Sequence, residues 1–289
     1  MDYRAIGMGV AFAFVWASAF TSARIIVADA PPLTALSIRF AISGAAGIGI
    51  AAWMGQGFRL TRLQWRAAAI FGICQNALYL GLNFVAMRTV EASLAAIVAS
   101  TMPLLVAFAQ WTTLSERMRP LGLVGLALGF AGVALIMGNR IADGVDPFGL
   151  ALCVGGVISL TAATLAAPSA APGGGVLMVV GIQMLVGAAA LAPVALATES
   201  WEVAWSPQML AAFAYTTVFP GLVATWIWFL LVNRIGAVRA ATFHFLAPPF
   251  GVAIAAALLG EALGASDIVG VATVAAGILA VQLSKRSAG

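Results

Sequence analysis

Ten apolar stretches run along the sequence, each long enough to cross the hydrocarbon core of a membrane as a helix. About 20 helical residues, at about 1.5 Å each, span about 30 Å of hydrocarbon. Only helices pair all their own backbone groups in lipid without closing into a barrel, and these stretches lack the period-2 alternation of barrel strands. We therefore predict an all-α, polytopic membrane protein with ten transmembrane helices over 5–27, 33–54, 67–87, 92–114, 120–138, 148–167, 174–196, 208–232, 238–259 and 266–283.

The composition supports a lipid environment and excludes several classes of function. Hydrophobic residues make up 63% of the chain and charged residues 8%, against about 25% charged in soluble domains. The 14 basic residues are scattered, so no nucleic-acid partner is expected. Cys74 and Cys153 lie in apolar stretches without metal-ligand spacing, and no Gly-x-x-x-x-Gly-Lys phosphate loop is present. We expect no metal, no cofactor and no direct use of ATP.

The basic residues indicate how the chain is oriented. With a cytoplasmic N-terminus, ten of the 14 lie at cytoplasmic helix ends, namely Arg4, Arg59, Arg62, Arg66, Arg117, Arg119, Arg234, Arg239, Lys285 and Arg286. This bias predicts a bacterial-type cell inner membrane with both termini cytoplasmic. Arg24 and Arg39 lie inside apolar stretches, where we expect each side chain to extend to the interface or to pair with Asp29. The first stretch is too long for a signal-peptide core, so we expect it to be retained.

The chain also repeats itself. A shift of 145 residues superimposes Pro103 on Pro248, Leu114 on Leu259, Glu116 on Glu261, Gly125 on Gly270 and Gly132 on Gly277. The two units, 1–140 and 146–285, hold five helices each. Because five is odd, the second unit enters the membrane from the opposite side. Inverted repeats are typical of secondary transporters, whose halves rock about a site at mid-membrane to expose it alternately.

Several motifs resemble the EamA-type drug/metabolite transporter superfamily. In the second half they are the stretch 228–237, Ala247-Pro248-Pro249, Leu259-Gly260-Glu261 and the Gly270 to Gly277 helix; the first half repeats them more loosely in Phe84 to Ala92, Pro103, Ser115-Glu116 and Gly125 to Gly132, after Phe14-Val15-Trp16-Ala17-Ser18. The resemblance implies ten helices, cytoplasmic termini and a central cavity. Similar proteins export amino acids and other metabolites, and a YddG-type branch exports aromatic amino acids and methyl viologen.

A solute crossing the membrane needs polar groups inside the bundle, preferably on one helix face. Gln75, Tyr79 and Asn83, at i, i+4 and i+8, form such a stripe on the third stretch, although bonding to neighbouring helices is an alternative. Trp16 lies near the middle of the first stretch and is another candidate for lining a cavity. Further substrate-binding candidates are Ser18, Thr21, Ser100, Thr101, Ser159, Thr164, Tyr215 and Trp226.

His244 is the only histidine and lies in the ninth stretch, where it is either a proton-sensitive group lining the cavity or a hydrogen-bonded core residue. Pro103, Pro248 and Pro249 remove backbone donors and are hinge candidates. The glycines of 122–132 and 270–277 favour close helix contact, either within the chain or in a homodimer.

The absences narrow the function further. No Asp or Glu lies at the centre of a predicted helix, so proton coupling is unsupported, and no catalytic pair suggests an enzyme. The few buried positive charges argue against nucleotide sugars and sugar phosphates. We expect a secondary transporter that exports small, partly apolar metabolites, with amino acids including aromatic ones favoured. The alternative is an exporter of drugs or organic cations of the methyl viologen type.

Overall fold

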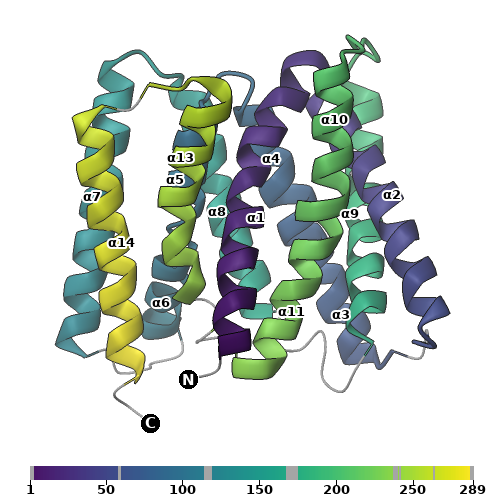
Figure 1. The fold of residues 1–289 in the computed structure, drawn as a ribbon, viewed down its shortest axis with the longest axis horizontal. Coiled ribbons are helices and arrows are strands. Elements are labelled where there is room, and N and C mark those ends of the chain that lie inside the picture. The colour runs from purple at the N-terminus through teal and green to yellow at the C-terminus, as the bar shows by residue number, and fades with distance from the viewer. Residues whose placement is uncertain are drawn as a thin grey trace.

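The computed structural model describes residues 3–57, 60–113, 119–166, 175–236, 240, 242–262 and 264–286. Within these ranges the chain is helical, without strands, and the helices stand side by side (Figure 1). Eight helical segments of this described part are long and apolar enough to cross a membrane, and two shorter apolar helices follow at 247–259 and 265–281. The ten-helix prediction is therefore confirmed. Glu116 and the turn before Gly175 lie outside the described residues.

The first repeat contains α1 (Tyr3–Asp29), α2 (Pro32–Trp53), α3 (Arg62–Phe71), η1 (Gly72–Leu80), α4 (Gly81–Ala86), α5 (Ala92–Ala99), α6 (Met102–Thr113) and α7 (Pro120–Ala142). The second contains α8 (Pro147–Ala166), α9 (Val176–Thr198), α10 (Pro207–Thr216), η3 (Thr217–Val223), α11 (Ala224–Ile235), η4 (Thr242–Leu246), α13 (Ala247–Leu259) and α14 (Ala265–Arg286). The start of α1 and the end of α14 lie at the same end of the bundle (Figure 1). We call this end the terminal side and the other the opposite side.

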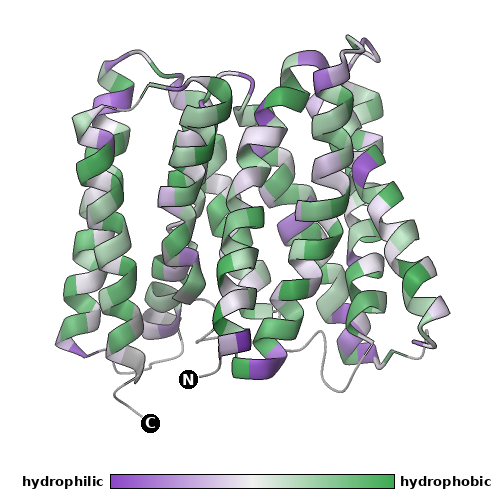
Figure 2. Cartoon of the chain, in the orientation of Figure 1, coloured by the Kyte–Doolittle hydropathy of each residue, from purple (hydrophilic) through white to green (hydrophobic). Residues whose placement is uncertain are grey.

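The outer surface of the bundle is apolar. Large hydrophobic side chains such as Ile42, Leu128 and Leu279 are exposed along the helices, and hydrophilic residues gather near the two ends (Figure 2). An apolar surface of this extent is unfavourable in water and suits lipid tails.

Two helix pairs join the repeats through glycine. The backbones of α7 and α14 approach so closely that a Cβ on Gly277 would lie 2.5 Å from Gly129 N and 2.7 Å from Gly125 O. In the α2–α9 pair, a Cβ on Gly44 would lie 2.9 Å from Gly181 O. Small residues permit this packing in lipid, where apolar burial supplies little attraction between helices. Gly125, Gly129 and Gly277 thus pack within one chain, and a homodimer through the glycine-rich helices stays a prediction.

Four helices are interrupted at repeat-related places. The third and eighth crossings each contain a π-helix, η1 from position 72 and η3 from position 217, and 72 plus the offset of 145 is 217. The fourth crossing breaks at Ser100 and Thr101, between α5 and α6. The ninth changes from the 3₁₀ turn η4 to α13 at the equivalent place. Interrupted helices are typical of transporter sites, and the two inverted repeats predicted from the sequence are confirmed.

Polar side chains cap helix N-termini across the two repeats. The Glu199 carboxylate accepts hydrogen bonds from Leu33 N and Thr34 N, at 2.8 and 2.7 Å, at the start of α2. Gln56 Oε1 accepts from Met178 N at 3.1 Å, the equivalent place in α9. These bonds satisfy backbone donors that a helix start leaves unpaired.

On the opposite side, the Glu261 carboxylate accepts from Ala92 N and Ser93 N, at 2.8 and 3.0 Å, at the start of α5. Nearby, Arg140 of α7 forms ion pairs with Glu91 at 2.7 Å and Asp267 at 2.8 Å, which ties α7 to both repeats. The Glu261 motif is therefore structural.

The glycine contact predicts a stability effect. Gly277→Ala places a methyl group against the α7 backbone, so it should lower the free energy of unfolding by about 1–3 kcal/mol and reduce the melting temperature of the detergent-solubilised protein. Gly138→Ala is the matched control, because nothing lies within 4 Å of its Cβ position. Equal melting temperatures for the two variants would contradict the close contact.

Candidate functional site

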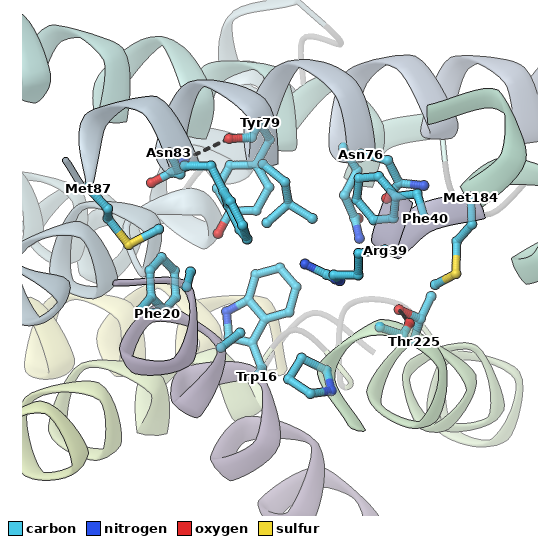
Figure 3. A pocket seen from close by; sticks show the side chains of 17 residues that line it. Trp16, Phe20, Arg39, Phe40, Asn76, Tyr79, Asn83, Met87, Met184 and Thr225 are labelled. Carbon is cyan, nitrogen blue, oxygen red and sulfur yellow. Dashed lines mark hydrogen bonds between the residues drawn. The ribbon is translucent and has the colours of Figure 1, made fainter. Parts of the chain in front are cut away.

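A central pocket lies between the two repeats, bounded by α1, α2, η1, α4, α9, η3 and α11 (Figure 3). Aromatic rings form much of its wall. Trp16 stacks on Tyr79 with ring centroids 6.0 Å apart and an interplanar angle of 6°, and Phe20, Phe40 and Phe84 also line the space. The space has room for only about two water molecules. Side chains must move before a larger molecule fits.

The pocket's polar groups come mainly from η1, α4 and α2. Asn83 Nδ2 donates to Tyr79 O at 2.8 Å, and Asn76 Nδ2 donates to Gln183 O at 2.9 Å, so the amides are held in place. The hydroxyl of Tyr79, Oδ1 of Asn83 and Nε of Arg39 are buried without a hydrogen-bond partner in the described part of the chain. A buried polar atom without a partner is costly, by about 1–3 kcal/mol. These three atoms are available to bind a ligand.

Arg39 corrects a prediction. Its side chain is 3% exposed and lines the pocket, and its guanidinium carbon lies 4.8 Å from the centroid of the Phe40 ring. The expectation that it extends to the membrane interface was wrong, because Arg39 lies on the buried stripe of α2 with Leu36, Phe40 and Ser43. From that face the Arg39 side chain extends into the interior of the bundle.

The pocket lies where the repeats meet. Several of its residues are related by the 145-residue shift: Arg39 with Met184, Gln75 with Pro220, Asn76 with Gly221 and Leu80 with Thr225. Equivalent positions of both units therefore face one space, as expected at the pseudo-two-fold axis of an inverted repeat. The first unit supplies most of the polar groups.

A smaller pocket adjoins the first and shares Trp16, Gln75 and Thr225 with it. Its wall includes an aromatic cluster of Phe12, Trp16, Trp228 and His244. The rings of Trp228 and His244 are 5.1 Å apart at 89°, and those of Phe12 and Trp228 are 5.1 Å apart. Phe12 is one helical turn nearer the start of α1 than Trp16. The aromatic cluster thus extends from the central pocket toward the terminal side.

On the opposite side of the bundle the open space is larger than the central pocket. Two hollows that share Val27, Ala28, Asp29 and Arg88 form a vestibule at the ends of the helices. Ala23 and Met87 line the central pocket, and the next residues, Arg24 and Arg88, line the vestibule. The Arg24 guanidinium donates to the Met87 carbonyl between the two spaces. Arg24 does not pair with Asp29, whose carboxylate accepts from Ser206 Oγ at 2.6 Å.

The predicted cavity residues separate into two groups. Trp16, Gln75, Tyr79 and Asn83 line the central pocket, and Thr164 and His244 line the smaller one. The others line neither pocket: Ser18 hydrogen-bonds Tyr215 at 2.6 Å, Ser100 and Thr101 bond to carbonyls of their own helix, Ser159 bonds to Cys74 O, Thr21 is buried, and Trp226 is 37% exposed. Substrate contact by these residues stays a prediction.

The three hinge candidates lie in the first turns after the interruptions. Pro103 follows the break at Thr101, and Pro248 and Pro249 begin α13. Their placement agrees with a role in bending, while the motion itself stays a prediction. Sequence reasoning missed Pro220, which lies inside η3 and lines the central pocket. It also missed Asn76 and Thr225, and the buried stripe of α2 was the signal that could have found Arg39.

Comparisons with known proteins agree with this arrangement. The model of the EamA-like transporter family matches residues 3–138 and again residues 147–283. The transporter YvbV of Bacillus subtilis, whose function is uncharacterized, is 23% identical over 274 residues, covering 94% of this chain and 90% of that protein. The uncharacterized transporter sll0355 of Synechocystis sp. is 24% identical over 283 residues, covering 90% of this chain and 84% of that protein. A crystal structure with 21% identity covers 98% of both chains at a TM-score of 0.71, which indicates a shared fold.

Adjacent positions on α11 test where the pocket lies. In a protein with Cys74 and Cys153 replaced by alanine, Thr225→Cys should react several-fold faster with a small anionic methanethiosulfonate reagent than Trp226→Cys. Thr225 lines both pockets and Trp226 lines neither, and only a hydrated thiol ionises to the reactive thiolate. Faster labelling of Trp226→Cys would contradict the pocket's position.

Proposed function

The chain belongs to the EamA-like transporter family, and from that premise we propose that it exports small metabolites, with amino acids including aromatic ones favoured, by alternating access to the central pocket. Its relatives are named as transporters, which confirms the expectation of a membrane transporter rather than an enzyme. The proposal places the protein in a bacterial-type inner membrane, with the terminal side in the cytoplasm because most basic residues lie there.

One observation supports the amino-acid assignment above the others: aromatic rings and buried polar atoms without partners face the same space. The Trp16 and Tyr79 rings can pack an apolar or aromatic side chain. Asn83 Oδ1 and the Tyr79 hydroxyl can hydrogen-bond the polar end of a solute. Concave sites with apolar walls and a few fixed polar groups are typical of small-molecule binding.

Alternating access has a structural basis in the interrupted helices. η1 and η3 both line the central pocket. At the breaks in the fourth and ninth crossings, Met102 and His244 line the smaller pocket. Small changes at these interruptions can move helix ends while the glycine pairs α7–α14 and α2–α9 stay packed. The aromatic cluster would then close the pocket on the terminal side. The Arg24–Met87 contact would close it on the vestibule side.

An exporter of organic cations is the second candidate. The stacked Trp16 and Tyr79 rings favour it, because aromatic faces attract quaternary ammonium groups. This candidate predicts that cells that overexpress the protein become resistant to methyl viologen. Arg39, in the same pocket, opposes it.

Proteoliposomes provide the direct test. Vesicles that contain the purified protein and are loaded with labelled phenylalanine, methionine or threonine should release them with saturable kinetics, since a carrier has a limited number of sites. Release no faster than from protein-free vesicles would refute the amino-acid assignment.

A pair of neighbouring glycines tests the role of the pocket in this flux. A Cβ on Gly156 would lie 2.5 Å from Asn83 Nδ2, whereas the Cβ of its neighbour Gly155 would meet nothing closer than Leu82 Cδ1 at 3.6 Å. Gly156→Ala should displace the Asn83 amide and reduce flux several-fold, while Gly155→Ala should keep it. Equal flux in both variants would remove Asn83 from the binding site.

A further inference from the structure

We infer that Arg39 makes the central pocket selective for organic carboxylates: aromatic acids without an amino group are accepted, and amines without a carboxylate are rejected. The inference rests on the proposed function, because it names the group by which the same pocket recognises its solutes. It also decides between the two candidate functions, since it excludes organic cations.

The location of the guanidinium is the first argument. Arg39 is 3% exposed and lines the central pocket. Figure 3 shows its side chain pointing into the pocket, toward the Trp16 ring. The guanidinium carbon lies over the Phe40 ring, 4.8 Å from the ring centroid. Because an aromatic face attracts a cation, this contact helps to hold the guanidinium group beside the pocket.

The charge of Arg39 has no counter-ion in the described part of the chain. No Asp or Glu lines the central pocket or the smaller pocket. The ion pairs found among the described residues belong to Arg140, on the opposite side. Nε of Arg39 has no hydrogen-bond partner, and the repeat-equivalent position is Met184, which is neutral. An isolated charge in a low-dielectric interior is costly unless it binds something.

A carboxylate is the ligand that fits these observations. A guanidinium stays charged and presents N–H groups in a fork that matches the two oxygens of a carboxylate. The aromatic rings beside it can pack the rest of an aromatic acid. An ammonium group finds only neutral acceptors, such as Asn83 Oδ1, and is therefore tolerated but not required. A solute whose only charge is positive meets the like charge of Arg39, which opposes binding in a low dielectric.

Three ligands with the same phenylethyl skeleton separate these features: phenylalanine, 3-phenylpropanoate, which lacks the ammonium group, and 2-phenylethylamine, which lacks the carboxylate. Binding to the detergent-solubilised full-length protein is measured by thermal stabilisation, since a ligand of the native state raises the melting temperature. We expect the first two ligands to stabilise the wild-type protein and 2-phenylethylamine to leave it unchanged. Stabilisation by 2-phenylethylamine equal to that by 3-phenylpropanoate would overturn the inference, as would an absence of binding by 3-phenylpropanoate.

Variants assign the effect to Arg39. Arg39→Gln should weaken 3-phenylpropanoate binding about tenfold or more, the range expected for a lost hydrogen bond to a charged group. Arg39→Lys keeps the charge without the fork and should bind with intermediate affinity. Arg88→Gln removes an equal charge from the vestibule and should bind as the wild type does. Wild-type affinity in folded Arg39→Gln would overturn the inference; if that variant does not fold, wild-type affinity in Arg39→Lys would overturn the bidentate contact.

The outcomes also separate this inference from the proposed function. If phenylalanine is exported and 2-phenylethylamine inhibits this efflux, the proposed export of amino acids stands and the carboxylate selectivity is refuted. Selective binding of 3-phenylpropanoate without efflux of any amino acid would leave the carboxylate site and remove the amino-acid assignment.

Discussion

Every backbone group inside a membrane must be paired within the protein, and this constraint decides where the helices of this bundle can be interrupted. An exposed break would leave N–H and C=O groups facing hydrocarbon. The break at Ser100 and Thr101 is instead buried, and the π segments η1 and η3 each place residues on the wall of the central pocket, although their other faces expose apolar side chains such as Leu78 and Phe219. At the helix ends, Glu199, Gln56 and Glu261 cap N-termini that would otherwise stay unpaired. Irregular backbone is thus confined to the walls of the pocket and to the two surfaces.

The bundle divides into a closely packed frame and an adaptable interior. The pairs α7–α14 and α2–α9 flank the molecule and pack through glycine, so their backbones have little room to separate or slide. Between them lie α1 and the interrupted crossings, whose side chains form the pocket. Packed pairs can move as units, whereas interrupted helices can bend. This division agrees with a mechanism in which the interrupted helices move about a site that the repeats share, while the two glycine pairs stay packed.

The sequence was sufficient for the fold but only partly for the pocket. Hydropathy located ten helices and the 145-residue shift identified the inverted repeat, because both signals extend over many residues. Gln75, Tyr79 and Asn83 were found because their polar stripe is unusual in an apolar helix. Arg39 was misread, since the long side chain of an isolated arginine in an apolar helix usually extends toward the interface. Trp226 follows η3, where a π turn rotates the residues after it relative to a regular helix, and a polar or aromatic residue type alone does not reveal such a rotation.

The pocket is built from equivalent positions that carry unlike side chains. Arg39 has Met184 as its equivalent in the second repeat, and Asn76 has Gly221. A scaffold with nearly interchangeable halves therefore encloses a site with a charged pole and a neutral pole. A dipolar solute has one preferred direction in such a site, fixed to the first repeat. It would keep that direction while the surrounding halves exchange the side on which they open, so it would leave the protein without having to turn round.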